Sequence, residues 1–154
     1  MQRRQLLLLG VASFAVNGVQ AASDPLVVIV GPATNIDGLE FGVLQRMFRG
    51  EAVNYAGSRR AVPFNHPVQT SERREFDRVV LGLSPDEVAR YWINRKIRGQ
   101  SGPPRTVPSS ALLLRVVAQL KGAIGYVRSS QLNGSVRPLR IDGKAHTDRD
   151  YRLG

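Results

Sequence analysis

The distribution of apolar residues along the chain predicts alternating strands and helices. Residues 26–30 form an unbroken apolar run, Leu-Val-Val-Ile-Val, that ends at a Gly-Pro pair, the pattern of a strand buried on both faces. From Leu39 to Phe48 the apolar residues recur at helical spacing before Gly50, which predicts an amphipathic helix of about three turns. Residues 61–65 predict a short strand, and Pro63 places it at a sheet edge or at a strand entry.

The second half of the chain contains the clearest helix start. Ser84 is suited to the N-cap, Pro85 to the first helical position and Glu87 to the reciprocal bond of a capping box. The helix that begins there is expected to reach about Arg98. The two other helices expected after residue 70 cover residues 71–81 and 111–121.

Two strands and a tail complete the pattern. Residues 123–127 and 136–141 are expected to be strands joined through an Asn133-Gly134 turn. Strands and helices thus alternate over residues 22–141, which indicates one α/β domain with a mixed sheet and helices on both faces. Residues 142–154 are charged and poor in apolar side chains, and we expect them to be a flexible C-terminal tail.

Residues 1–21 carry the pattern of a secretory signal peptide. Arg3 and Arg4 form a basic start, Leu6 to Val19 an apolar stretch of 14 residues, and Val19-Gln20-Ala21 a small-x-small cleavage site. The alternative is a membrane anchor, but a spanning helix needs roughly 20 apolar residues and this stretch contains Asn17. The chain has no cysteine that a lipid could acylate, so we expect a mature protein in the periplasm without a membrane anchor.

The composition limits the kinds of ligand and partner that such a protein is expected to bind. Without Arg3 and Arg4, 20 basic residues stand against 12 acidic ones, a formal net charge of +8, and such a field attracts anions. The basic residues are scattered and no aromatic side chains are interleaved with them, so binding of nucleic acid is not expected. With no cysteine and only two histidines, neither disulfides nor a metal centre are expected, and we predict no cofactor.

The sequence lacks the usual motifs of catalysis. It contains no Gly-x-Ser-x-Gly, no His-Glu-x-x-His and no Walker loop. An enzyme would need a nucleophile with a base, or paired carboxylates in a pocket, and no such set stands out. We therefore expect a protein that is not an enzyme.

Several short motifs follow one another in a set order over residues 26–127. After the apolar strand come Leu-Gln-Arg-Met-Phe-Arg-Gly at 44–50, Ser-Glu-Arg-Arg-Glu-Phe at 71–76, a Trp-bearing helix, and Gly-Ala-Ile-Gly-Tyr-Val at 122–127. This order resembles the later half of the phosphate-binding proteins that feed phosphate ABC transporters. The resemblance implies a single lobe of the periplasmic-binding-protein type, where full family members close two lobes on a phosphate.

The phosphate loop that the resemblance implies is kept only in part. In the family this loop has Arg, three residues, and then Ser-Gly-Thr. Here Ser71 matches the serine, whereas Glu72 and Arg73 replace Gly and Thr, and Pro67 stands where the Arg would be. Glu72 would place a negative charge where an oxyanion binds, and we expect Arg73 and Arg74 to offset it.

The chemistry of a helix N-terminus indicates an anion site in the same region, independently of the resemblance to the family. Free N–H groups and the positive end of the dipole at a helix N-terminus bind oxyanions, and a hydroxyl with an arginine adds charge-assisted donors. The expected ligand-binding residues are therefore Thr70, Ser71, Arg73 and Arg74. The alternative is that Ser71 only caps the helix.

Two functions follow from these observations. The first is a periplasmic, non-enzymatic binding protein that takes phosphate or another oxyanion weakly, in connection with phosphate transport. The second is an interaction module on the same fold that contacts an envelope protein or a transporter and binds no small ligand. Glu72 and Pro67 favour the second function, and the basic charge and the helix start favour the first.

Overall fold

A computed structural model describes residues 23–55, 57 and 59–154. The predicted signal peptide therefore lies outside the described residues. The main element is a five-stranded mixed sheet with strand order β6-β5-β7-β1-β8. Its strands are β1 (Leu26–Val30), β5 (Val62–Asn65), β6 (Arg105–Thr106), β7 (Ala123–Arg128) and β8 (Arg137–Pro138).

Two small strand pairs flank this sheet. Strands β2 (Gly38–Leu39) and β9 (Arg140–Ile141) run parallel to each other. Strands β3 (Asn54–Tyr55) and β4 (Arg59–Arg60) form an antiparallel pair.

Strand β1 lies at the centre of the core, as its unbroken apolar sequence predicts. Leu26, Val28 and Val30 pack into the apolar cluster on one face of the sheet. Val27 and Ile29 pack into the cluster on the other face. The strand is antiparallel to both of its neighbours, β7 and β8, so its edges as well as its faces are covered.

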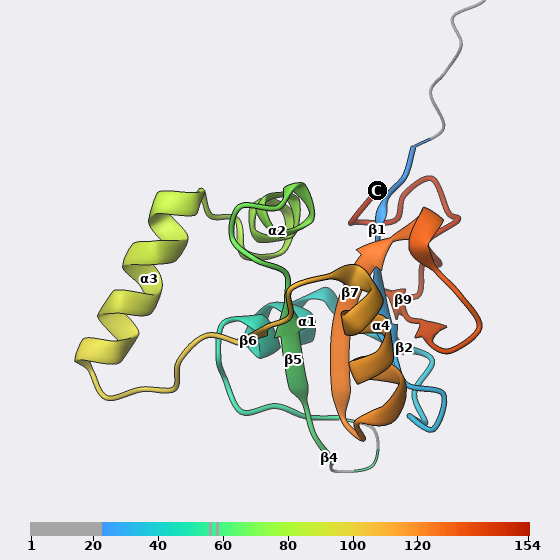
Figure 1. The fold of residues 1–154 in the computed structure, drawn as a ribbon, viewed down its shortest axis with the longest axis horizontal. Helices are drawn as coiled ribbons and strands as arrows, with labels where there is room; N and C mark the ends of the chain where they lie inside the picture. The colour runs from blue at the N-terminus through green and yellow to red at the C-terminus, as the bar shows by residue number, and fades with distance from the viewer. Residues whose placement is uncertain (1–22, 56, 58) are drawn as a thin grey trace, which may run out of the picture.

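Helices cover both faces of the sheet, which confirms the predicted α/β class (Figure 1). On one face lie α1 (Phe41–Phe48) and a second helical segment, which consists of α2 (Ser71–Phe76) and the π-helical turn η1 (Asp77–Leu81). On the other face lies α4 (Ser110–Gln119). The amphipathic patterns that predict these helices therefore correspond to real packing faces.

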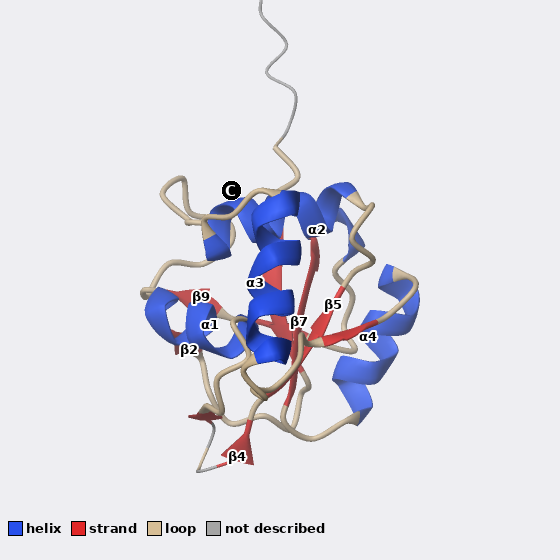
Figure 2. Cartoon of the chain, turned by 90° about the vertical axis from the view of Figure 1, so that its left-hand side faces the viewer, coloured by secondary structure: helices blue, strands red, loops and turns tan. Residues whose placement is uncertain are grey.

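Helix α3 (Pro85–Ile97) stands apart from the sheet (Figure 1), and it lies in front of the strands when the molecule is viewed from that side (Figure 2). Its start is the predicted capping box, in which Ser84 Oγ accepts a hydrogen bond from Glu87 N and Ser84 N donates to the Glu87 carboxylate. Val88 is its only buried residue. The helix is thus well defined along the chain but exposes most of its surface.

Strand β5 corresponds to the strand predicted over residues 61–65. It lies inside the sheet and runs parallel to both β7 and β6. Strand β6 pairs only with Phe64 and Asn65, so Pro63 has a strand neighbour on one side only. A residue without an N–H group is tolerated at such an entry position.

The hairpin predicted around Asn133-Gly134 is wrong. Strand β7 is paired with β5 on one edge and with β1 on the other, so it has no free edge for the segment that follows it. The chain instead passes through the 3₁₀ turn η2 (Ser129–Gln131) and reaches the far side of β1. The strand predicted over residues 136–141 is split between β8 and β9, which pair with different partners.

The structure also differs from the prediction of a flexible tail from Asp142 onward, because this segment packs against the core. Tyr151 and Leu153 are 3% and 1% exposed and belong to the main apolar cluster. Leu26 N donates to Leu153 O at 3.2 Å, which ties the end of the chain to the start of β1. Two apolar anchors are enough to fix a segment whose composition is otherwise charged.

Among residues 23–55, 57 and 59–154, no helix combines the length and the apolar character that crossing a membrane requires.

Candidate functional site

The start of α2 lies at the edge of the sheet where the parallel strands β5 and β7 end. Arg128, the last residue of β7, reaches over to α2, and its Nη2 lies 2.6 Å from Glu75 Oε2. Asp24, just before β1, accepts hydrogen bonds from Ser129 and Ser130 at the same edge. In α/β folds, ligands bind at the carboxyl ends of such strands.

Thr70 is the N-cap of α2, one residue earlier than a cap at Ser71 would be. Its backbone is extended, and its Oγ1 accepts a hydrogen bond from Arg73 N at 3.3 Å. The same hydroxyl donates to Pro67 O at 2.8 Å. With its proton donated within the loop, the Thr70 hydroxyl shapes the helix start and has no donor left for a ligand.

Arg73 points into the protein. Its side chain is 4% exposed, its Nε lies 2.7 Å from Asp77 Oδ2, and its Nη1 donates to His66 O at 3.1 Å. The guanidinium therefore links Asp77, one helical turn further on, to His66, the residue that follows β5. This geometry corrects the expectation that Arg73 offsets the charge of Glu72 at an open anion site.

The Arg73–Asp77 pair belongs to a buried polar network below α2. His66 Nε2 donates to Tyr126 O at 2.8 Å, and the Tyr126 hydroxyl donates to Asn65 Oδ1 at 3.0 Å. Burial raises the pKa of the Tyr126 hydroxyl, which keeps this donor protonated.

Asp77 is the least satisfied member of this network. Its Oδ1 has no hydrogen-bond partner among the described residues. Desolvation raises the pKa of its carboxyl, while the charge of Arg73 and its hydrogen bond act in the opposite direction. The pair is thus a structural feature with an electrostatic cost.

Ser71 and Arg74 remain exposed at the start of α2. Ser71 Oγ donates to Glu72 Oε2 at 3.2 Å, and Arg74 Nη1 donates to Gln69 O at 3.0 Å. Both residues line an open cavity of about 580 Å³, together with Arg78, which follows Arg74 by one helical turn. The wall of this cavity therefore carries the hydroxyls of Ser71 and Ser84, two guanidinium groups, and the carboxylate of Glu75, which is paired with Arg128.

The carboxylate of Glu72 lies beside an arginine that is far from it in the sequence. Arg128 Nε lies 4.0 Å from Glu72 Oε1, in addition to its shorter contact with Glu75. Glu72 and Arg128 are 56 positions apart, so only the pairing of β7 with β1 and β5 brings them together.

The structure thus divides the predicted site. It leaves Ser71 and Arg74 exposed and uses Thr70 and Arg73 within the fold. It also places Arg78 on the same cavity wall, and Arg128 beside Glu72 and Glu75. Arg78 could have been found in the sequence, because it repeats Arg74 at helical spacing. No local signal points to Arg128.

Within the part of the chain that the structure describes, no group of three or more histidine, cysteine or acidic side chains is placed to hold a metal ion.

No protein-family model and no curated protein matches the sequence. Solved structures do match. An ABC-type phosphate transport receptor from Vibrio cholerae superposes with a TM-score of 0.67 at 16% identity, over 84% of this chain and 53% of the receptor. A putative phosphate ABC transporter substrate-binding protein from Clostridium perfringens, solved with bound phosphate, gives 0.64 at 18% identity, over 79% of this chain and 46% of that one.

A third similar structure is PstS from Borrelia burgdorferi, with a TM-score of 0.66 at 13% identity, over 84% of this chain and 54% of PstS. The chain therefore has the α/β fold of phosphate ABC transporter substrate-binding proteins, as the order of its motifs predicts. It spans about half the length of these receptors and corresponds to a single lobe.

Proposed function

We propose that the protein is a non-enzymatic binding protein of the periplasm that takes phosphate or a similar oxyanion weakly at the start of α2. The observation that carries this proposal is the cavity wall on which Ser71, Arg74 and Arg78 lie together. The phosphate receptors of the same fold support it, and they also suggest a connection with phosphate transport. In this proposal Thr70 and Arg73 hold the helix start in place, and Ser71 and Arg74 contact the anion.

Backbone donors add to these side chains. Among the described residues, neither Ser71 N nor Glu72 N donates a hydrogen bond, because both belong to the first turn of α2. Such free N–H groups at the positive end of a helix favour anions. The contact of Arg128 with Glu72 lowers the repulsion that this carboxylate would exert on an oxyanion.

Weak affinity follows from the openness of the cavity. Exposed charge pairs contribute only about 0.2–1 kcal/mol each, because water screens them. A few such contacts give a dissociation constant near millimolar, which corresponds to about −4 kcal/mol. Binding should also weaken as salt is added.

The direct test is calorimetric titration of the purified protein with phosphate and with sulfate at low salt. The double variant Ser71→Ala, Arg74→Ala should lose most of the binding, whereas Arg90→Ala, an exposed arginine on α3, should bind as the unchanged protein does. No heat of binding at low salt, or equal losses in the double variant and in Arg90→Ala, would refute the proposed site.

A second candidate function is docking of an envelope protein on α3. Ile93 and Ile97 are 57% and 77% exposed and lie one turn apart on the same side of the helix. Val68, 66% exposed, lines an apolar cavity of about 330 Å³ at the base of this helix, together with Ala89 and Trp92. Contiguous exposed apolar side chains of this kind mark interaction surfaces.

Photo-crosslinking in the producing cell tests the docking function. A photoreactive residue at position 97 should give a defined adduct with one envelope protein, and the same residue at the polar position Arg90 should not. An adduct at neither position, together with the phosphate binding described above, would leave oxyanion binding as the function.

A further inference from the structure

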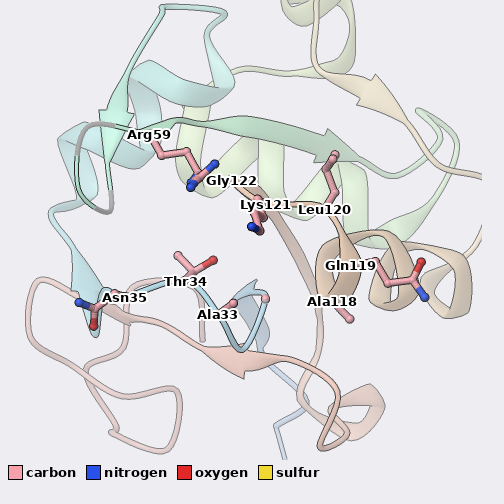
Figure 3. A pocket seen from close by; sticks show the side chains of 10 residues that line it. Ala33, Thr34, Asn35, Arg59, Ala118, Gln119, Leu120, Lys121 and Gly122 are labelled. Carbon is pink, nitrogen blue, oxygen red and sulfur yellow. The ribbon is translucent and has the colours of Figure 1, made fainter.

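A second cavity lies at the opposite edge of the sheet from the start of α2. It has a volume of about 300 Å³ and is bordered by the loop after β1, by β4, by the C-terminal end of α4 and by the turn that leads into β7 (Figure 3). This volume is at the lower end of the range for pockets that hold small molecules. Its polar side chains are Thr34, Asn35, Arg59, Gln119 and Lys121.

Close backbone packing fixes the walls of this cavity. A Cβ atom at Gly31 would lie 2.6 Å from Val117 O, so only glycine lets the loop after β1 approach the end of α4 this closely. Gly122 has φ +87°, and a Cβ there would lie 2.8 Å from Arg60 O. The Tyr55 hydroxyl donates to Gly122 O at 2.8 Å and anchors the turn from below. The cavity is therefore formed before any ligand arrives.

Two cationic side chains point into the cavity. Figure 3 shows the ends of Arg59 and Lys121 directed toward the same space, with Thr34 facing them. The stem of Arg59 packs over Gly122, where its Cδ would lie 3.3 Å from a Cβ atom. No ion pair joins either cation to a carboxylate within the described residues, and the cavity lining contains no acidic residue.

Residues at the end of α4 whose backbone carbonyls have no partner also line this cavity. Ala118 and Gln119 are among the last residues of α4, where carbonyl groups have no partner within the helix. Among the described residues no backbone N–H beyond the helix donates to either carbonyl. The cavity thus offers cations for a negative group and carbonyls for hydroxyl groups.

We propose that this cavity binds a small hydroxylated oxyanion, a sugar phosphate or a hydroxycarboxylate. Arg59 and Lys121 hold its charged group, and the final carbonyls of α4 accept hydrogen bonds from its hydroxyls. A lysine close to a helix C-terminus can also serve only to balance the helix dipole. That role does not account for Arg59, which comes from a separate strand and converges on the same space.

Amide NMR titration of the purified protein tests the site directly. Ribose 5-phosphate and citrate represent the phosphate and the carboxylate, and ribose is the uncharged control. We expect saturable shifts of the amides of Gly31, Thr34 and Gly122 with at least one anion and none with ribose. The tighter of the two anions then assigns the charged group.

Matched variants separate this site from general attraction to a basic protein. Arg59→Ala and Lys121→Ala should each weaken binding of that anion by about tenfold, since each removes a charge-assisted hydrogen bond. Arg60→Ala should leave it unchanged, because Arg60 borders a different cavity. Circular dichroism checks that each variant is folded, which is expected for exposed side chains.

Three results would overturn the proposal. The first is the absence of shifts at Gly31, Thr34 and Gly122 with both anions, including the case in which shifts occur only between residues 70 and 78. The second is an equal loss of affinity in Arg60→Ala and Arg59→Ala. The third is unchanged affinity in both Arg59→Ala and Lys121→Ala.

Discussion

The segment of α2 and η1 and helix α3 begin with the same kind of signal but are held to the protein in different ways. Each starts at a hydroxyl cap, Thr70 for the first and Ser84 for the second. The α2–η1 segment is fixed by apolar burial and by the Arg73–Asp77 pair. Helix α3 is fixed largely by polar contacts at its inner edge, where the Tyr91 hydroxyl donates to Arg49 O at 2.9 Å.

The difference shows that a cap determines where a helix begins, whereas contacts with the core determine whether the helix is buried. The capping box at Ser84 determines where α3 begins, because its bonds involve only neighbouring residues. Burial depends on what the rest of the chain places beside the helix. For α2–η1 this is the central sheet, and Phe76 stacks on Tyr126 of β7 with ring centroids 3.8 Å apart. For α3 it includes the end of α1, where Tyr91 and Arg95 donate hydrogen bonds to Arg49 O and Gly50 O.

The largest difference in stability should come from replacing one apolar side chain in each helix by alanine. Phe76 is 0% exposed and Ile97 is 77% exposed. Phe76→Ala should lower the free energy of unfolding by about 3–5 kcal/mol, because it leaves a cavity in the core. Ile97→Ala should change it by less than about 0.5 kcal/mol. Urea denaturation measures both, and a large loss in Ile97→Ala would mean that α3 is packed in solution.

The next largest effect should distinguish the two neighbouring arginines of α2. Arg73→Met removes the partner of a buried carboxylate, Asp77, and should cost about 3 kcal/mol of stability. Arg74→Met changes an exposed side chain and should cost less than about 0.5 kcal/mol. The same two variants titrated with phosphate should show the reverse order of binding loss. If Arg73→Met were as stable as the unchanged protein, the network below α2 would not have the role assigned to it.

The sequence predicts the features that depend on neighbouring residues. The burial of β1 follows from its five consecutive apolar residues, and the start of α3 follows from Ser84, Pro85 and Glu87. Both were confirmed because a strand buried on two faces and a capping box each leave a complete local pattern.

Features that depend on strand order could not be predicted in the same way. The hairpin at Asn133-Gly134 fails because β1 occupies the edge of β7, and nothing in the turn itself shows this. The prediction of a flexible tail fails because it rests on average composition, which gives no weight to the two buried residues Tyr151 and Leu153.

The candidate site shows the same limit. The spacing of Arg73 and Asp77 allows an ion pair on one helix face, but only the position of the sheet makes that face the buried one. Arg128 and the cavity at Arg59 and Lys121 combine segments that are far apart in the chain.

A smaller effect should separate the two caps. Thr70→Ala removes a hydroxyl that makes two hydrogen bonds and should lower global stability by about 1–2 kcal/mol. Ser84→Ala should cost about 1 kcal/mol or less, and it should act mainly on α3. Hydrogen exchange distinguishes these outcomes, because the amides of α3 alone should exchange faster in Ser84→Ala. Faster exchange throughout the sheet in Ser84→Ala would show that α3 unfolds only together with the core.

The smallest expected effect concerns the pH dependence that Asp77 gives to the α2–η1 segment. Desolvation raises the pKa of its carboxyl in the folded protein above the ordinary value. The folded state therefore binds this proton more tightly than the unfolded state does. The resulting stabilisation is present below the ordinary pKa of an aspartate, about 3.9, and is lost as the pH rises through the folded-state pKa. Asp77→Asn has no such proton, so its stability relative to the unchanged protein should rise from about pH 4 upward.

Asp24 provides the matched control for this measurement, because hydrogen bonds from Ser130 and Ser129 lower the pKa of its carboxyl. Its stabilisation is present above the ordinary aspartate pKa and is lost as the pH falls through the folded-state pKa, so Asp24→Asn should remove a dependence of the opposite sign. Urea denaturation of both variants from about pH 2 to about pH 7 gives the two slopes, that of Asp24 below about pH 4 and that of Asp77 above it. If the stability of Asp77→Asn fell relative to the unchanged protein as the pH rose, the attraction of Arg73 would outweigh desolvation. The electrostatic cost assigned to the Arg73–Asp77 pair would then be wrong.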